Sequence, residues 1–173
     1  MTSDSCQVEF DFRFGWCRMR LDVAGISATY RATSIVDSFG ALAYAVATVA
    51  AGAMTASALW GDEPGGVFLD LSTSGPHYVG LVVAGLDSPG WITPESPPWT
   101  PVRGAVLTNA IIPREVALRA FHTGFSSALD RVSEHGRIEG WGHRFPTAAL
   151  AAIDATTARG RGPVPADPTR RPG

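Results

Sequence analysis

The chain has 173 residues, of which 45% are hydrophobic and 17% are charged, and its formal net charge is −2. This length suits one domain with a sizeable core, and the net charge argues against a general nucleic-acid-binding protein, which normally carries a basic surface. The first five residues lack the basic and apolar regions of a signal peptide. Cys6 and Cys17 are too few for a disulfide framework. We therefore expect a cytoplasmic protein with free thiols.

Apolar and charged residues alternate along the first part of the chain, at the two-residue period of a half-buried strand. Residues 8–14 follow this pattern up to Gly15, and residues 17–23 resume it. A third short strand is expected over residues 26–30. The charged positions mix Arg with Asp and Glu, which is typical of a solvated sheet face. The small, apolar Cys17 is expected in the core.

An uncharged, alanine-rich stretch covers residues 38–61 and allows two interpretations. Its length would suffice for a membrane span, which needs about 20 apolar residues. However, most of its residues are small, and small residues gain little in a bilayer. The apolar side chains recur every three or four residues from Ile35 to Ala53, which marks one face of a packed helix. We therefore favour a buried helix over residues 34–59 and no membrane association.

The remaining elements follow from similar patterns. Residues 67–71 and 78–83 predict a second hairpin, and residues 105–112 another strand. Pro113 is well placed to open a helix, which Gly136 would end. A last short helix is expected after Phe145. The residues expected on the buried faces of these two helices are Leu118, Phe121, Phe125, Leu129, Val132, Leu150 and Ile153.

These elements predict an α+β fold. We expect a two-layer sandwich, with a mostly antiparallel sheet of about five or six strands. Two main helices and a short C-terminal helix would cover one face of that sheet. The domain would span residues 1–158. Residues 159–173 are rich in Arg, Gly and Pro, have little to bury, and are expected to be a disordered tail.

A proline-rich segment over residues 87–103 interrupts this pattern. It contains five prolines together with Trp91 and Trp99, so it suits neither a helix nor a central strand. A loop of this length is uncommon and is often functional. The two tryptophans would either pin the loop to the core or anchor a partner, and we weight the two interpretations equally.

The sequence contains no catalytic signature. The four histidines lack the spacing of a zinc site, and the glycines match no phosphate-binding loop. We therefore expect neither a metal nor a cofactor. Asp62 and Glu63 are adjacent acids that rarely face one substrate, so they do not suit acid–base catalysis. We favour an ordinary turn between a helix and a strand at this position, and recognition of an Arg-rich partner is the functional alternative. If the protein is an enzyme, His77 and His122 are the candidate acid–base residues.

Two short segments carry a resemblance. The run from a strand into a long helix, followed by WGDEPG at residues 60–65 and a hairpin, resembles small actinobacterial proteins of unassigned function. The segment WGHRFP at residues 141–146, ahead of a helix containing Leu150, is similar to endings in such proteins and in polymorphic-toxin immunity proteins. The resemblance implies a compact α+β binding protein, some relatives of which lie beside toxins, and it assigns no catalytic residues to this sequence. The proline-rich segment is not part of this pattern.

Three hypotheses of function follow. The first is a non-catalytic binding protein, of which immunity-type neutralisation of a partner protein is one form. The second is a small enzyme or ligand-binding protein of secondary metabolism, with residues 87–103 as a lid over a small molecule. The third is a homodimer that self-associates through the small-residue helix face or a free sheet edge. Under the first hypothesis the contact residues are Trp60, Asp62, Glu63, Trp91 and Trp99.

Overall fold

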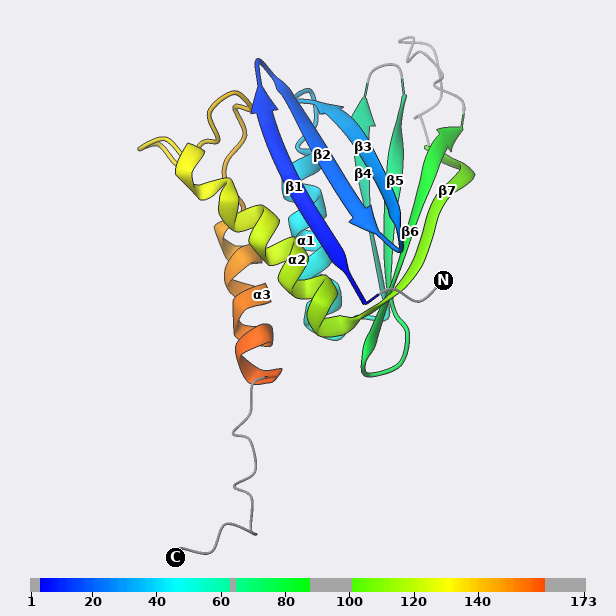
Figure 1. Ribbon diagram of the computed structural model, residues 1–173. Coiled ribbons are helices and arrows are strands. Elements are labelled where there is room, and N and C mark those ends of the chain that lie inside the picture. Colours follow the sequence, from blue (N-terminus) through cyan, green and yellow to red (C-terminus); the bar gives the residue numbers. More distant parts are fainter. Residues whose placement is uncertain (1–3, 63–64, 88–100, 161–173) are drawn as a thin grey trace, which may run out of the picture.

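The computed structural model of the protein describes residues 4–62, 65–87 and 101–160. These residues form an α+β structure with two antiparallel sheets of three and four strands and with three α-helices (Figure 1). The α+β class expected from the sequence is confirmed, although the strands number seven and divide into two sheets. The elements, in chain order, are β1 (Cys6–Arg13), β2 (Trp16–Val23), β3 (Ile26–Thr33), α1 (Ser38–Ala50), β4 (Thr55–Asp62), β5 (Gly65–Thr73), β6 (Tyr78–Asp87), β7 (Val102–Pro113), α2 (Arg114–Ser127), a 3-10 turn (Leu129–Arg131) and α3 (Thr147–Gly160).

The first sheet is the meander β1-β2-β3, and its three strands were expected from the alternating sequence. Tight turns join the strands. Phe14 and Gly15 both have positive φ angles, of 50° and 81°, as a two-residue hairpin turn requires. The inward-facing side chains of β2 are fully buried, and they include Cys17, which confirms the core position expected for this residue.

Helix α1 is shorter than the sequence predicted. Asp37 caps its first turn by accepting a hydrogen bond from the Gly40 backbone N–H at 3.0 Å. The helix ends at Ala50, and Gly52 follows with a φ of 106°, a conformation that favours glycine. Thr55–Asp62 is strand β4, so the expected continuation of the helix to Leu59 is wrong. Of the helices that the described residues form, none combines the length with the hydrophobicity that a transmembrane span requires.

The second sheet has the order β4-β5-β6-β7. It contains the predicted second hairpin as β5 and β6, and the predicted strand 105–112 lies within β7. Strands β6 and β7 pair regularly from Tyr78 to Val83, and their register shifts between Val83 and Leu86. The buried inward-facing residues of β4, β5 and β6 alternate with a second set of side chains on the opposite face of the sheet.

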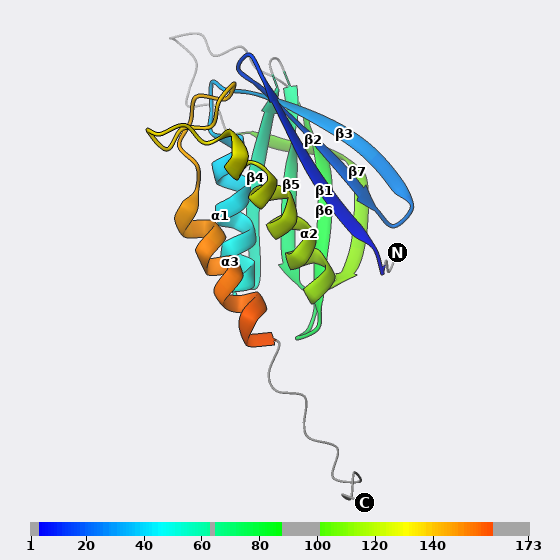
Figure 2. The same ribbon diagram turned by 60° about the vertical axis from the view of Figure 1, so that its left-hand side comes forward.

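The helices lie together on one side of the four-stranded sheet, as two views of the chain show (Figures 1 and 2). Helix α1 packs on β4 and β5, α2 packs on β1, and α3 packs on both of these helices. Between these elements Phe10 stacks on Phe125 and contacts Phe39 edge-on, with ring centroids 5.4 and 4.9 Å apart. Gly124 fits against the Val8 carbonyl, where an added Cβ would lie only 2.7 Å from the oxygen.

The C-terminal helices differ from expectation in length. Leu118, Phe121 and Phe125 are buried as predicted, but α2 ends at Ser127, and Leu129 is exposed. The expected helix to Gly136 is therefore wrong beyond Ser127, where a 3-10 turn and a loop follow. Helix α3 begins at Thr147 and buries Leu150 and Ile153, as predicted. The tail expected to be disordered lies almost wholly outside the described residues.

Candidate functional site

The outward-facing surface of the three-stranded sheet is charged. Arg20 of β2 lies 3.1 Å from Asp22 and 3.9 Å from Glu9 of β1. Asp11 pairs with Arg13 at 3.0 Å. These side chains alternate with the buried residues of the same strands. This is the pattern of a sheet face that is solvated by water, as the sequence predicted for this region.

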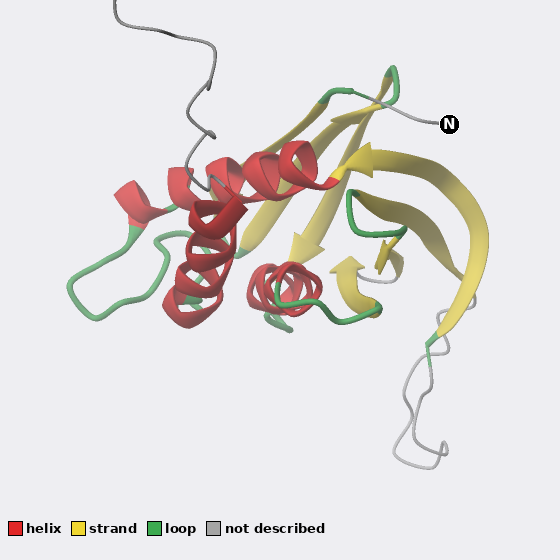
Figure 3. Cartoon of the chain, turned by 90° about the horizontal axis from the view of Figure 1, so that it is seen from below, coloured by secondary structure: helices red, strands yellow, loops and turns green. Residues whose placement is uncertain are grey.

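The outward-facing surface of the four-stranded sheet is different. We call it the outer face; it lies opposite the helices and the three-stranded sheet, and no described element covers it (Figures 1 and 3). Apolar side chains reach this face from every strand. Tyr78 is 44% exposed and Val106 is 60% exposed. The residues that the strand alternation and register place on this face include Leu59, Phe68, Tyr78, Val82, Ala84, Val106, Asn109 and Ile111.

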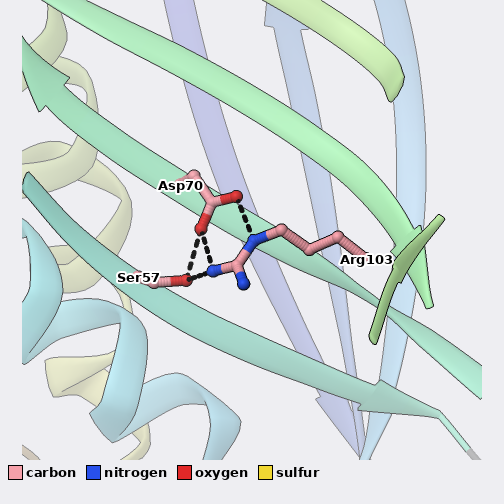
Figure 4. Close-up of polar contacts among 3 residues, drawn as sticks. All are labelled: Ser57, Asp70 and Arg103. Carbon is pink, nitrogen blue, oxygen red and sulfur yellow. Dashed lines mark hydrogen bonds and ion pairs between the residues drawn. The ribbon is translucent and has the colours of Figure 1, made fainter. Parts of the chain in front are cut away.

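One polar cluster crosses this apolar surface, formed by Ser57, Asp70 and Arg103 (Figure 4). Nε and Nη2 of Arg103 each donate to Asp70 at 2.7 Å, so the ion pair is bidentate. Nη2 also donates to Ser57 Oγ at 2.9 Å, and the Ser57 hydroxyl donates to Asp70 Oδ1. The guanidinium lies 4.3 Å above the Phe68 ring, a cation–π arrangement. The cluster thus holds three strands in a fixed side-chain geometry.

The hydrogen bonds from Arg103, more than any other influence, lower the pKa of Asp70 below its ordinary value. The hydrogen bond to Asp70 in turn raises the pKa of Arg103. Both groups therefore remain charged at neutral pH. Their mutual neutralisation leaves the outer face with little net charge, because no other charged side chain stands among the outer-face residues named above.

The candidate acid–base histidines occupy a separate cleft of about 490 Å³ between the β5–β6 turn, α2 and α3. Both His77 and His122 line it, and Asp154 faces it from α3. The Asp154 carboxylate lies 2.6 Å from His122 Nε2, and the Ser126 hydroxyl lies 3.5 Å from the same nitrogen. A catalytic triad needs the serine and the carboxylate on opposite ring nitrogens, so these three residues do not form one.

The residues predicted to bind a partner are not brought together on one described surface. Trp60 is fully buried on the inner face of β4. Trp60, predicted as a contact residue, is therefore not available at the surface, because its place in the strand alternation points its side chain into the core. Its indole N–H has no hydrogen-bond partner among the described residues. Asp62 is half-buried at the end of β4 and lies 3.4 Å from Arg31. Glu63, Trp91 and Trp99 lie outside the described residues.

The WGHRFP segment has a structural role. The Trp141 indole N–H donates to Asp37 Oδ1 at 3.2 Å, the same oxygen that caps α1. His143 Nε2 donates to the Ser34 carbonyl at 2.6 Å. Phe145 is buried and contacts the ring of Phe39. The segment therefore fastens the C-terminal loop to the start of α1, and this contact explains its residues without a ligand.

Sequence reasoning missed the Ser57, Asp70 and Arg103 cluster. The one sequence feature that could have indicated this cluster is Asp70, a single acid inside the apolar run VFLDL at residues 67–71. Ser57 is the cross-strand partner of Asp70, but a register cannot be read from two separate strands. Arg103 is the last residue of the proline-rich segment and lies 33 positions after Asp70 in the sequence. Asp154 was missed for the same reason, because α3 meets α2 only in the folded chain.

Comparison with family models, curated proteins and solved structures found no match for this chain. The described residues also contain no group of three or more His, Cys, Asp or Glu side chains placed to hold a metal ion. The fold and the site are therefore the basis for inferring a function. They comprise an α+β structure with one charged sheet face, one largely uncharged sheet face and a histidine-lined cleft.

Proposed function

We propose that this protein is a non-catalytic binding protein of the cytoplasm that presents the outer face of its four-stranded sheet to a partner protein. The observation that carries the proposal is the contrast between the two sheet surfaces. A sheet face that meets only water is normally polar, and contiguous apolar surface on a folded protein marks an interaction site. Apolar side chains lie on all four strands of the outer face, with Tyr78 and Val106 exposed, and they share it with Thr55, Ser72 and Asn109 and with one internally neutralised ion pair.

The chemistry of the outer face favours a protein over other ligands. A small molecule binds in a concave pocket, and the cleft described above lies elsewhere on the molecule. A nucleic acid requires unpaired basic groups that contact phosphate, whereas Arg103 is held by Asp70. An apolar surface with tyrosine and arginine matches the composition of protein–protein interface cores. The partner is therefore expected to offer a complementary apolar surface.

The test begins with site-specific photocrosslinking in the native host. A photoreactive residue at position 78 of the outer face is expected to crosslink one protein. The same residue at Thr29, an exposed position on the charged face of the three-stranded sheet, should not. The crosslinked protein is then purified, and its binding to the chain is measured with both components in hand.

With the purified partner, Tyr78→Asp and Val82→Arg are expected to weaken binding at least tenfold. Thr29→Asp serves as the matched control and should bind as the wild type does. Val82 lies opposite Asp70 in the register, and the Asp70 carboxylate is already paired with Arg103. Equal binding by all the variants, with unchanged melting temperatures, would remove the outer face from the proposal.

The resemblance of the WGHRFP segment to immunity proteins suggests a class of partner, namely a toxin whose activity this chain neutralises. What supports this narrower proposal is that resemblance together with the apolar side chains of the outer face. A toxin gene beside the encoding gene, and inhibition of its product by wild type but not by Tyr78→Asp, is the expected result. A partner that has no toxic activity would be consistent with the proposed binding function but would contradict the proposal of neutralisation.

A second candidate, binding of a small molecule, is favoured by the cleft. His122 and Asp154 meet there at 2.6 Å, and His77 lines the same space. Native mass spectrometry of chain purified from its host is expected to show a bound compound, which His122→Gln loses. His135→Gln is the control, because His135 is exposed, lies beside Glu134 and is not among the residues that line the cleft. Retention of the compound by His122→Gln would place its site elsewhere.

A further inference from the structure

The guanidinium of Arg103 is held on the outer face by several contacts at once. Nε and Nη2 donate to the Asp70 carboxylate at 2.7 Å, and Nη2 also donates to Ser57 Oγ at 2.9 Å. The Cζ atom lies 4.3 Å from the centroid of the Phe68 ring. Arg103 starts on β7, whereas these partners belong to β4 and β5 (Figure 4). Residues from three strands therefore fix the position of one polar side chain.

The exposure of these residues differs in one direction. The Arg103 side chain is 49% exposed, while the Asp70 side chain is 29% exposed. Phe68 is only 6% exposed, although it lies on a sheet face that no described element covers, because the guanidinium lies over its ring. Arg103 is thus anchored on the side of the sheet and open on the side of the solvent.

Part of the hydrogen-bonding capacity of Arg103 is unused. An arginine side chain carries five N–H donors, and the three bonds from Arg103 use only those of Nε and Nη2. Within the part of the chain that the structure describes, Nη1 makes no hydrogen bond or ion pair, and in Figure 4 it is the nitrogen that no dashed line reaches. The donors of Nη1 therefore stand in a fixed place on a largely apolar surface.

We propose that Arg103 is the specificity-determining residue of the outer face, and that its Nη1 donates to an uncharged carbonyl oxygen of the partner protein. The carbonyl belongs to the partner's main chain or to an Asn or Gln side chain. This inference rests on the proposed function of the outer face. Charge selects the acceptor: Asp70 already neutralises Arg103, so a second carboxylate would bring a net negative charge into an apolar interface. A carbonyl oxygen accepts the same bond without that penalty.

The fixed geometry favours binding as well as specificity. A free arginine side chain loses rotamer freedom when a partner binds it, and this loss opposes association. In Arg103 the loss has already occurred in the folded chain, because Asp70 and Ser57 hold the guanidinium. Arginine is also among the residues that most often dominate the energy of an interface. In this inference Asp70 and Ser57 are positioning residues, which act on the partner through Arg103.

Arg31, on the charged face of the three-stranded sheet, provides a matched control. Its guanidinium also lies over an aromatic ring, with Cζ 5.0 Å from the centroid of Trp16. It also pairs with a carboxylate, Asp62, but through Nη2 alone and at 3.4 Å. The two arginines thus share the same types of contact and differ in the sheet face and in how firmly each is held.

The test measures the affinity of Arg103→Lys for the purified partner that photocrosslinking at position 78 identifies. Lysine keeps a positive charge beside Asp70 but lacks the planar group and its Nη1 donors. Arg103→Lys is expected to weaken binding about tenfold, with a melting temperature close to that of the wild type. Arg31→Lys should bind as the wild type does. Equal losses for the two variants would overturn the assignment to Arg103.

Asp70→Asn distinguishes the two kinds of acceptor by the sign of its effect. If the partner offers a carbonyl oxygen, Asp70→Asn is expected to weaken binding several-fold, because Arg103 is no longer held in place. If the partner offers a carboxylate, the same change strengthens binding, because it leaves the Arg103 charge without its neutralising partner. Stronger binding would therefore overturn the uncharged acceptor, and unchanged binding would overturn the positioning role of Asp70. This variant also carries the test if circular dichroism shows that Arg103→Lys is misfolded.

Tyr78→Asp separates this inference from the proposed function. If Tyr78→Asp weakens binding and Arg103→Lys does not, the outer face remains the contact surface and the role of Arg103 is overturned. If Tyr78→Asp binds as the wild type does, or if crosslinking finds no partner, the proposed function fails and the inference fails with it.

The fixed geometry can be measured in the free chain by NMR of the arginine side chains. The Nε–H of Arg103 donates to Asp70, whereas Arg31 bonds to Asp62 through Nη2. The Arg103 Nε–H is therefore expected to exchange with solvent at least severalfold more slowly than the Arg31 Nε–H. Equal exchange rates would show that Arg103 is not held before binding and would overturn the inference.

Discussion

The two sheets of this protein bury similar inner faces but present opposite outer ones. On the three-stranded sheet, Arg20 pairs with Glu9 and Asp22 in a row of alternating charges. On the four-stranded sheet, the corresponding positions hold mainly apolar side chains, together with Thr55, Ser72 and Asn109. Its one ion pair is closed on itself by two short hydrogen bonds. One chain thus provides its own reference for what a solvated sheet face looks like. By that reference, the outer face of the four-stranded sheet is suited to contact with protein.

The largest expected effect tests which side of β4 faces the core. Trp60→Ala is expected to lower the free energy of unfolding by about 3–5 kcal/mol, because it removes a fully buried aromatic side chain. Leu59→Ala, one residue earlier on the outer face, should cost only about 1 kcal/mol. Urea denaturation of both variants measures the difference. Equal losses would mean that the two faces are not distinguished as described.

The next effect compares the ion pairs of the two faces. Asp70→Asn is expected to lower the free energy of unfolding by about 1 kcal/mol, because it weakens a bidentate pair and a hydrogen bond from Ser57. Asp22→Asn should change it by less than about 0.5 kcal/mol, since Arg20 keeps Glu9 as a partner. If urea denaturation gives the same loss of unfolding free energy for the two substitutions, the Asp70 cluster stabilises the fold no more than an exposed surface ion pair does.

The Asp70 cluster also predicts a pH dependence. Hydrogen bonds from Arg103 lower the pKa of Asp70 in the folded chain. A carboxyl group of this kind stabilises the fold above its unfolded pKa of about 3.9 and loses that contribution as pH falls through the folded value. The difference in unfolding free energy between wild type and Asp70→Asn should therefore have its maximum value at pH 6 and become smaller below about pH 4. A difference that grows on acidification would contradict this.

The smallest effect concerns the inner face of the three-stranded sheet. Burial, with a smaller contribution from Asp22, raises the pKa of Cys6 to about 11. The Cys6 thiol therefore contributes to the stability of the folded chain below its ordinary pKa. This contribution is lost as pH rises towards 11. At pH 8 its thiolate fraction is roughly a hundredfold below that of an ordinary thiol. Reaction with a thiol reagent should slow accordingly in the folded chain, and unfolding should restore it. A fast native reaction at Cys6 would count against its burial.

Local patterns predicted most of the fold. The alternation of residues 8–23, the hairpin over 67–83 and the buried stripe from Leu118 to Phe125 all appear in the structure. The error at Thr55–Asp62 has a physical reason. Ala, Ser and Thr carry little hydrophobic contrast, so the three- to four-residue period of α1 could be extended into a strand whose inward positions are Ala58 and Trp60.

The site could not be predicted in the same way, because it arises from pairing. Ser57 and Asp70 become neighbours only through the register of β4 and β5, and Arg103 reaches them from β7 across the sheet. Nor does the sequence separate the outer face from the inner one on β6, where nearly every residue is apolar. The turn-like motif that follows Trp60 suggested that this side chain is exposed. It is buried because the alternation of strand β4 places it on the inner face.

Titration calorimetry with the purified partner tests the central claim most directly. Once photocrosslinking at position 78 has identified the partner, Tyr78→Asp on the outer face and Thr29→Asp on the charged face are compared at one pH and salt concentration. We expect at least a tenfold loss of affinity for Tyr78→Asp and none for Thr29→Asp. The reverse order, or equal affinity for both, would show that the partner does not recognise the outer face.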